Sequence, residues 1–165
     1  MNPQFSVKNK VVVITGGGGV LGSCVARSLA ASGANIALIT RNESALDQLV
    51  KELNETEGEA IAIQADILSE ASLLEAKNKV INHFGGVDIL LNIAGGNLPG
   101  ATIGEDQTIF DLAIEDFDAV TKLNLNGTVI PSLIFGKAMA DKKEGIIINY
   151  SSMAVQQAIT RVAGY

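Results

Sequence analysis

The residues of this chain best suited to chemistry begin in a glycine-rich turn, residues 15–22, that follows a short apolar run. Glycine adopts backbone angles closed to other residues, and it lets a ligand approach the main chain closely. If a helix starts in this turn, its free N–H groups favour a phosphate, and the pattern Gly17-x-Gly19-x-x-Gly22 fits a dinucleotide fingerprint. The residues that we expect to surround the pyrophosphate are Gly16, Gly18, Gly19, Leu21 and Gly22.

A second candidate lies about 20 residues further on, where one side chain distinguishes NAD from NADP. A carboxylate there holds the ribose 2′-hydroxyl of NAD, whereas an arginine suits the 2′-phosphate of NADP. The second apolar run ends at Thr40, and Arg41 follows it directly. The sequence therefore favours NADP(H), and the nearby Glu43 keeps NAD open as the alternative.

These candidates must be positioned by strands and helices that alternate along the chain. Short β-branched runs predict strands over residues 10–15, 35–40, 59–65, 87–92 and 145–150. Apolar residues at helical spacing predict helices over residues 20–32, 44–57, 69–84, 115–124 and 128–140. Such alternation produces right-handed βαβ units. It predicts an α/β fold with a Rossmann-like, doubly wound parallel sheet in a single domain, residues 1–165.

The first predicted helix carries an expectation about its buried face. Leu21, Val25 and Leu29 recur every four residues, so we expect them to pack on the sheet. Cys24 lies beside them, and we expect it to behave as a small packed residue.

Two connections also carry expectations. The loop over residues 95–108 is the longest and is rich in glycine. It follows the carboxyl end of a strand, where parallel sheets bind ligands, so it is either a wall of a substrate site or a surface connection. The turn over residues 141–144 holds four consecutive charged residues, and we expect these side chains to be solvated.

Composition excludes several classes of function. The chain has 165 residues, 47% of them hydrophobic, and 12 basic against 18 acidic side chains give a net charge of −6. Acidic chains are poor binders of nucleic acid, and no apolar run approaches the ~18 residues of a membrane span. One cysteine, Cys24, excludes an internal disulfide, and no Cys/His cluster suggests a metal site. A single histidine, His83 in a helix end, argues against a Ser-His-Asp hydrolase. The default expectation is a cytoplasmic protein.

Four further motifs follow the glycine turn in order. They are Asp66-Ile67, Asn92-Ile93-Ala94-Gly95, Asn124-Leu125-Asn126-Gly127, and Ser152 followed thirteen residues later by Tyr165. Together with the glycine turn, these motifs resemble the short-chain dehydrogenase/reductase family. Two departures from the family pattern are Val20, where a glycine is usual, and Ile93, where a second asparagine is usual.

The resemblance implies a coenzyme site and a catalytic set for hydride transfer to a small-molecule ketone. It implies that Tyr165 is the general acid/base, that Ser152 polarises the carbonyl, and that Asn124 holds a helix kink and a water. A tyrosine hydroxyl ordinarily titrates near about pH 10, so this work near neutrality needs nearby positive charge. Further coenzyme contacts implied by the resemblance are Asp66, Ile67, Asn92, Ala94 and Gly95.

The family's lysine, four residues beyond its tyrosine, has no position in a sequence that ends at Tyr165. One interpretation is that a longer enzyme supplies the lysine and the rest of the fold, whose C-terminal part is absent here. The other is a non-catalytic dinucleotide-binding fragment. We favour the first.

A finer resemblance concerns substrate and assembly. Residues 16–21 and Ala94-Gly95-Gly96-Asn97 look like the D-mannonate oxidoreductase (fructuronate reductase) branch of the family, which implies a sugar-acid ketone. A 3-oxoacyl thioester or a polyol remains the alternative substrate. The family also implies a homo-oligomer, a tetramer or dimer, with contacts from the helix that carries Leu133, Ile134 and Met139.

Overall fold

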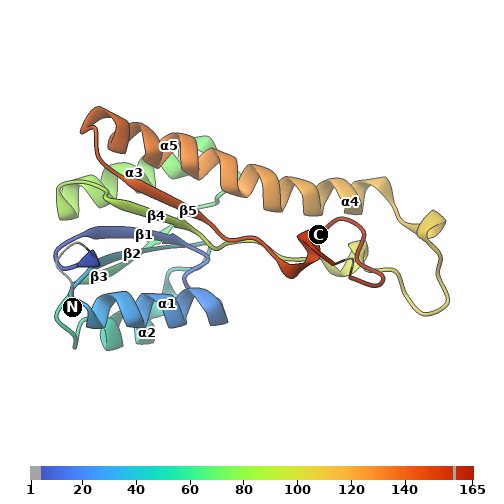
Figure 1. Cartoon of the computed structure of the whole chain (residues 1–165), viewed down its shortest axis with the longest axis horizontal. Helices are drawn as coiled ribbons and strands as arrows, with labels where there is room; N and C mark the ends of the chain where they lie inside the picture. Colours follow the sequence, from blue (N-terminus) through green and yellow to red (C-terminus); the bar gives the residue numbers. More distant parts are fainter. Residues whose placement is uncertain (1–4, 158) are drawn as a thin grey trace.

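In the part of the chain that the structure describes, five parallel strands form the central sheet, in the order β3-β2-β1-β4-β5 (Figure 1). The structure is a computed structural model that describes residues 5–157 and 159–165. The strands are β1 Val11–Thr15, β2 Asn35–Thr40, β3 Ala60–Gln64, β4 Ile89–Asn92 and β5 Ile146–Asn149. Their register aligns Thr15 with Ile39 and Asn92, and Asn92 with Asn149. Four strands therefore end at one edge, which confirms the predicted parallel sheet.

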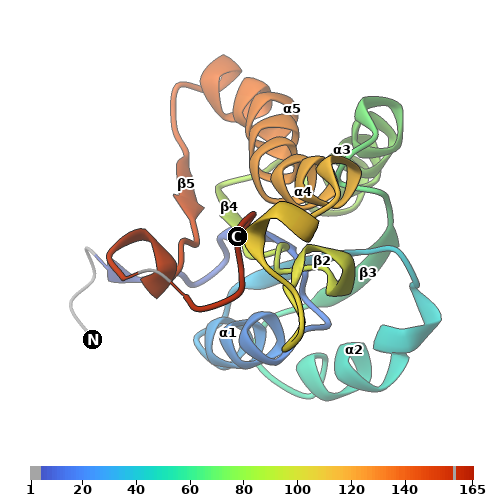
Figure 2. The same ribbon diagram turned by 90° about the vertical axis from the view of Figure 1, so that its right-hand side faces the viewer.

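Helices cover both faces of this sheet, so the doubly wound α/β fold is confirmed (Figure 2). Figure 2 shows α1 and α2 on one side, with α3, α4 and α5 on the other. Each side has its own core: Val12, Ile14 and Leu38 face α1 and α2, whereas Val13, Leu90 and Phe135 lie on the side of α3 and α5. The helices are α1 Val20–Ala31, α2 Asp47–Leu53, α3 Glu70–Phe84, α4 Ile114–Thr121 and α5 Gly127–Asp141.

The buried face of α1 differs from the prediction by one position. Its buried residues are Gly22, Ala26 and Ala30, whereas Leu21 is 52% exposed. The start of this face must be small because the helix begins directly against the glycine turn. A Cβ on Gly22 would lie 2.3 Å from the Gly16 carbonyl oxygen. Val25 and Leu29 pack only at the margin of the core. The expectation that Cys24 is packed was also wrong, because its side chain is exposed.

The second predicted helix is shorter than expected. It begins with a 3₁₀ turn, Ser44–Leu46, and its α-helical part ends at Leu53. The reason is Asn54, whose side chain accepts the Ala60 N–H (2.7 Å) and donates to the Ala60 carbonyl oxygen (3.0 Å). This side chain replaces the next helical turn with a link to the start of β3.

The predicted break between residues 124 and 128 is wrong. A π-helical segment, Lys122–Asn126, joins α4 to α5 in one continuous run. Within α5, Ile134 and Met139 are buried in the core, whereas Leu133 is 69% exposed. Of the three residues considered for contacts between subunits, only Leu133 is therefore available. No helix in the described ranges combines the length and apolar character needed to cross a bilayer.

The charged turn after α5 is not merely solvated, which corrects the prediction. Lys142 pairs with Asp88, and Lys10 Nζ lies 2.9 Å from Glu144 Oε1. Asp88 also accepts the backbone N–H of Val11 (2.8 Å). Partial burial opposes its charge, but the hydrogen bonds from Lys142 and Val11 hold the pKa of Asp88 below its ordinary value. We call Lys10, Asp88, Lys142 and Glu144 the charged clasp; it ties together the starts of β1, β4 and β5.

Candidate active site

The glycine turn after β1 is shaped by close approaches that exclude side chains. Gly16 has φ +69°, and a Cβ there would lie 2.8 Å from the Ala94 Cα. A Cβ on Gly18 would lie 2.8 Å from Leu46 Cδ2. The turn leads into α1, whose first residues present unpaired N–H groups in the manner of anion-binding helix ends. The bare backbone and this helix end therefore fit a pyrophosphate.

Thr15 fixes the turn to the end of β4, a role that the sequence analysis missed. Its side chain is fully buried, and its hydroxyl oxygen accepts the backbone N–H groups of Ile93 and Ala94, both at 3.2 Å. The hydroxyl lies 3.5 Å from the Leu91 carbonyl oxygen, to which it donates. A polar β-branched residue at the end of an apolar strand was the available signal.

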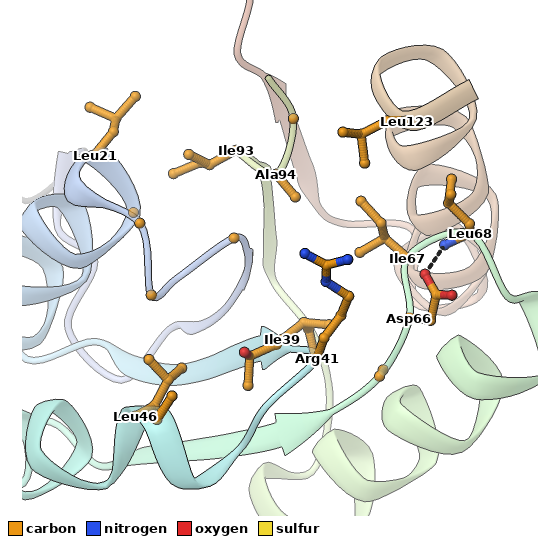
Figure 3. A pocket seen from close by; sticks show the side chains of 18 of the residues that line it. Leu21, Ile39, Arg41, Leu46, Asp66, Ile67, Leu68, Ile93, Ala94 and Leu123 are labelled. Atoms are coloured by element: carbon orange, nitrogen blue, oxygen red, sulfur yellow. Dashed lines mark hydrogen bonds between the residues drawn. The ribbon is translucent and has the colours of Figure 1, made fainter. Parts of the chain in front are cut away.

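A cavity of about 680 Å³ opens at the carboxyl edge of the sheet (Figure 3). The Arg41 side chain extends from the end of β2 into this cavity. Asp66 Oδ1 accepts the Leu68 N–H (2.9 Å), which holds the carboxylate at the cavity wall. The structure brings together here the predicted coenzyme residues Gly16, Gly18, Gly19, Leu21, Gly22, Arg41, Asp66, Ile67, Ala94 and Gly95.

Asn92 lies elsewhere. Its side chain is 2% exposed and is directed toward α5 and β5. Its Nδ2 donates to Ser132 Oγ (2.9 Å) and to Asn149 Oδ1 (2.8 Å). The structure therefore places this predicted coenzyme contact between β4, β5 and α5, behind the cavity.

A second cavity of about 360 Å³ adjoins the first. The two share a wall made of Leu21, Ile93, Ala94 and Gly95. The second cavity brings together the three predicted catalytic residues, Asn124, Ser152 and Tyr165.

Both the side-chain amide and the backbone carbonyl of Asn124 form hydrogen bonds. Its Nδ2 donates to the carbonyl oxygens of Gly96 (2.9 Å) and Val120 (3.0 Å), and its Oδ1 accepts the Gly96 N–H (2.9 Å). Its own carbonyl oxygen accepts the Thr128 hydroxyl (2.9 Å). The π-helical segment that contains Asn124 is a feature often found at functional sites. Asn124 therefore locks the loop after β4 to the helix.

Ser152 and Tyr165, which both carry hydroxyl groups, line the second cavity. Ser152 caps a short 3₁₀ turn, because its Oγ accepts the Ala154 N–H (3.1 Å). That bond uses a lone pair and leaves the hydroxyl proton free to donate. Tyr165 is 44% exposed. Further lining residues that the sequence analysis missed are Thr128, Tyr150, Ala154 and Val155; only their nearness to the motifs could have indicated them.

A family model described as short chain dehydrogenase matches residues 10–165. An uncharacterized oxidoreductase of Haemophilus influenzae is 38% identical in an alignment of 172 positions, which covers 98% of this chain and 60% of the relative. The chain thus spans about three fifths of the length of such relatives.

Two solved structures extend the comparison. A putative D-mannonate oxidoreductase from Haemophilus influenza with bound NAD superposes with a TM-score of 0.89 at 38% identity, covering 96% of this chain and 60% of that one. An NAD⁺-bound xylitol dehydrogenase has a TM-score of 0.87 at 30% identity, covering 96% and 59%. Together with the glycine turn and the two cavities, these likenesses show that the chain belongs to the short-chain dehydrogenase family.

Proposed function

We propose that this chain is the coenzyme-binding domain of an NAD(P)(H)-dependent oxidoreductase that interconverts a small polar ketone and a secondary alcohol. The observation that carries the proposal is the shared wall of the two cavities. Through this wall the cavity of about 680 Å³ adjoins the one lined by Asn124, Ser152 and Tyr165. A bound nicotinamide coenzyme would supply or accept the hydride.

The chain's own residues bind and orient the reactants. The glycine turn would hold the pyrophosphate, and Asp66 and Ile67 would contact the adenine. Ser152 has a free hydroxyl proton to donate to a substrate carbonyl oxygen. Tyr165 would deliver a proton to the same oxygen during reduction, and take one up during oxidation. Asn124 would keep the loop after β4 against the helix, and so hold the wall between the cavities.

The coenzyme proposed is NADP(H), with NAD(H) as the alternative. Arg41 supports NADP(H), because its guanidinium extends into the larger cavity (Figure 3) and suits a 2′-phosphate. The NAD bound to the similar putative D-mannonate oxidoreductase supports the alternative. Titration with both coenzymes decides between them. We expect Arg41→Ala to weaken NADPH binding by about ten-fold or more, with NADH affinity unchanged.

The substrate proposed is a sugar-acid ketone, as in D-fructuronate reduction, because of the likeness to the putative D-mannonate oxidoreductase. A polyol is the second candidate, favoured by the likeness to the xylitol dehydrogenase. The test follows nicotinamide absorbance with D-fructuronate, D-mannonate and xylitol. Ser152→Ala and Tyr165→Phe should abolish turnover and retain coenzyme binding. Coenzyme binding without turnover of any ketone or alcohol would favour the alternative, a non-catalytic dinucleotide-binding module.

We also propose that the protein forms homo-oligomers through α5. Val129 and Leu133 lie four residues apart in α5 and are exposed, at 44% and 69%. Such spacing places them on one face. Sedimentation of Leu133→Asp beside the unaltered protein tests this, with a smaller assembly expected for the variant.

A further inference from the structure

The segment that ends in Tyr165 is bridged to the loop that follows β4. Thr102 and Val162 form an antiparallel bridge, and the Ile103 N–H donates to the Arg161 carbonyl oxygen (2.9 Å). Figures 1 and 2 both show the end of the chain beside this loop. We call this pairing of residues 102–103 with residues 161–162 the loop bridge. It joins two segments that are far apart in the sequence.

The loop side of the bridge is anchored to the helical run. A Cβ on Gly100 would lie 2.4 Å from Asp116 Oδ1, so the loop lies directly on the first turn of α4. Ala101 is fully buried, and Asn97 Nδ2 donates to Thr102 Oγ1 (2.6 Å). Asn124 holds both polar backbone groups of Gly96, at the start of the same loop. Residues 102–103 of the bridge therefore belong to a loop that is held against the helical run.

The other side of the bridge leads directly to the candidate general acid. Arg161 has φ +66°, a conformation that is strained for a residue with a side chain and persists only where its surroundings enforce it. Here the Arg161 carbonyl oxygen is held by the Ile103 N–H, and the exposed Arg161 side chain also approaches Glu105, with Nη1 and Oε1 3.5 Å apart. Gly164 then lies on α4, where an added Cβ would be 3.3 Å from Val120 Cβ and 3.4 Å from Phe117 Cδ2.

We propose that the loop bridge and the contact of Gly164 with α4 position Tyr165 in the second cavity. Ile103 and Gly164 are then positioning residues for proton transfer, although neither lines the cavity. The loop that forms part of the ligand wall therefore also sets the place of the general acid. This inference rests on the proposed function, in which Tyr165 moves the proton.

Ile103→Pro tests the bridge, because proline has no N–H to donate to the Arg161 carbonyl oxygen. The preceding residue, Thr102, has φ −103° and ψ 120°, which a following proline accepts. The matched control is Ile109→Pro. Thr108, before it, is equally extended (φ −113°, ψ 173°), and residue 109 begins a 3₁₀ turn, where proline is tolerated. Gly164→Val, with Gly86→Val as its control in open space, tests the contact with α4.

The first readout does not need catalysis. The chain has no tryptophan and only two tyrosines, so in a Tyr150→Phe background the intrinsic fluorescence reports Tyr165 alone. Tyr165 is 44% exposed, so release should raise its quenching by acrylamide about two-fold in Ile103→Pro and Gly164→Val. Both control variants should match the Tyr150→Phe parent. Equal quenching in Ile103→Pro and Ile109→Pro would overturn the inference.

The second readout uses turnover of the Tyr150-containing protein. A misplaced general acid should lower kcat by roughly a hundred-fold in Ile103→Pro and leave coenzyme affinity unchanged. An unchanged kcat would overturn the inference. A chain that shows the quenching difference but reduces no ketone, even before substitution, would reject the proposed function and retain the positioning of Tyr165.

Discussion

The two edges of the sheet use opposite chemistry. At the amino edge, the charged clasp pairs each of its side chains with another, next to the first residues of β1, β4 and β5. At the carboxyl edge, glycines and aliphatic side chains form most of the lining of the two cavities, and Asn124 and Ser152 are among the polar residues of the second one. The charged lining residues are Arg41 and Asp66. Groups that satisfy one another fix strands in place. Groups that are to bind a ligand must keep hydrogen-bonding capacity free, as Ser152 does.

The largest expected effect comes from placing a side chain in the glycine turn. Gly22→Val would bring a Cβ within 2.3 Å of the Gly16 carbonyl oxygen, so the turn and the start of α1 must separate. We expect coenzyme affinity to fall by at least about a hundred-fold, and stability by about 2–3 kcal/mol. Calorimetric titration and urea unfolding measure the two effects. Gly86→Val is the control, since nothing lies within 4 Å of its Cβ position.

The opposite edge should show the reverse pattern. Asp88→Ala removes the acceptor for both Lys142 and the Val11 N–H, and should lower the free energy of unfolding by about 2 kcal/mol. Coenzyme affinity at the far edge should stay within about two-fold, because distant sites contribute independently. Asp141→Ala, which breaks only the exposed pair with Lys137, should change stability little. A large loss of affinity in Asp88→Ala would show that the edges are coupled.

Acid should reduce the stabilisation that the charged clasp provides before it affects the glycine turn, which has no charged side chain. The pKa of Asp88 is lowered in the folded chain, so its contribution is complete above the ordinary aspartate value of about 4. The contribution is lost as pH falls through the lower folded-state value. The hydrogen bond with Glu144 raises the pKa of Lys10, and this contribution is lost as pH rises through that raised value. Urea unfolding across pH should show both losses, and Asp88→Asn should flatten the acid limb.

The smallest effect should follow from a hydroxyl at the carboxyl edge. Thr128→Val removes the donor to the Asn124 carbonyl oxygen and preserves the shape of the side chain. We expect a loss of about 1 kcal/mol in stability, which chemical denaturation measures. Thr128→Ser keeps the hydroxyl and should recover most of that loss. Equal losses in the two variants would mean that the methyl group, and not the hydrogen bond, stabilises the segment.

The sequence predicted the sheet and the glycine turn because these depend on local signals. An apolar β-branched run followed by four glycines strongly favours a strand and then a tight turn, as β1 and the turn after it show. The face of α1 was misjudged because hydrophobicity favoured Leu21, whereas space at the turn admits only Gly22. Periodicity likewise cannot show that a π-helical segment continues a helix, so the join at Asn124 was missed.

In the candidate site too, features set by local sequence signals could be predicted, whereas features set by packing could not. Arg41 could be placed at a strand end from the chain pattern, and Ser152 from the family resemblance, and both line the cavities. Asn92 has the same kind of position in the sequence, but the pleat directs its side chain to the face of the sheet that α5 covers. The partners of Asp88 and Thr15 come from segments distant in sequence, so no local pattern could reveal them.

The strand order affects the stage of folding at which the candidate site can form. β1 lies between β2 and β4 in the sheet. Thr15 therefore cannot accept the N–H groups of Ile93 and Ala94 until more than 70 further residues have been synthesised. The first three strands can assemble early during synthesis, whereas closing the long loop to β4 is slow and entropically unfavourable. The glycine turn is therefore made well before the strand that completes its ligand-binding shape.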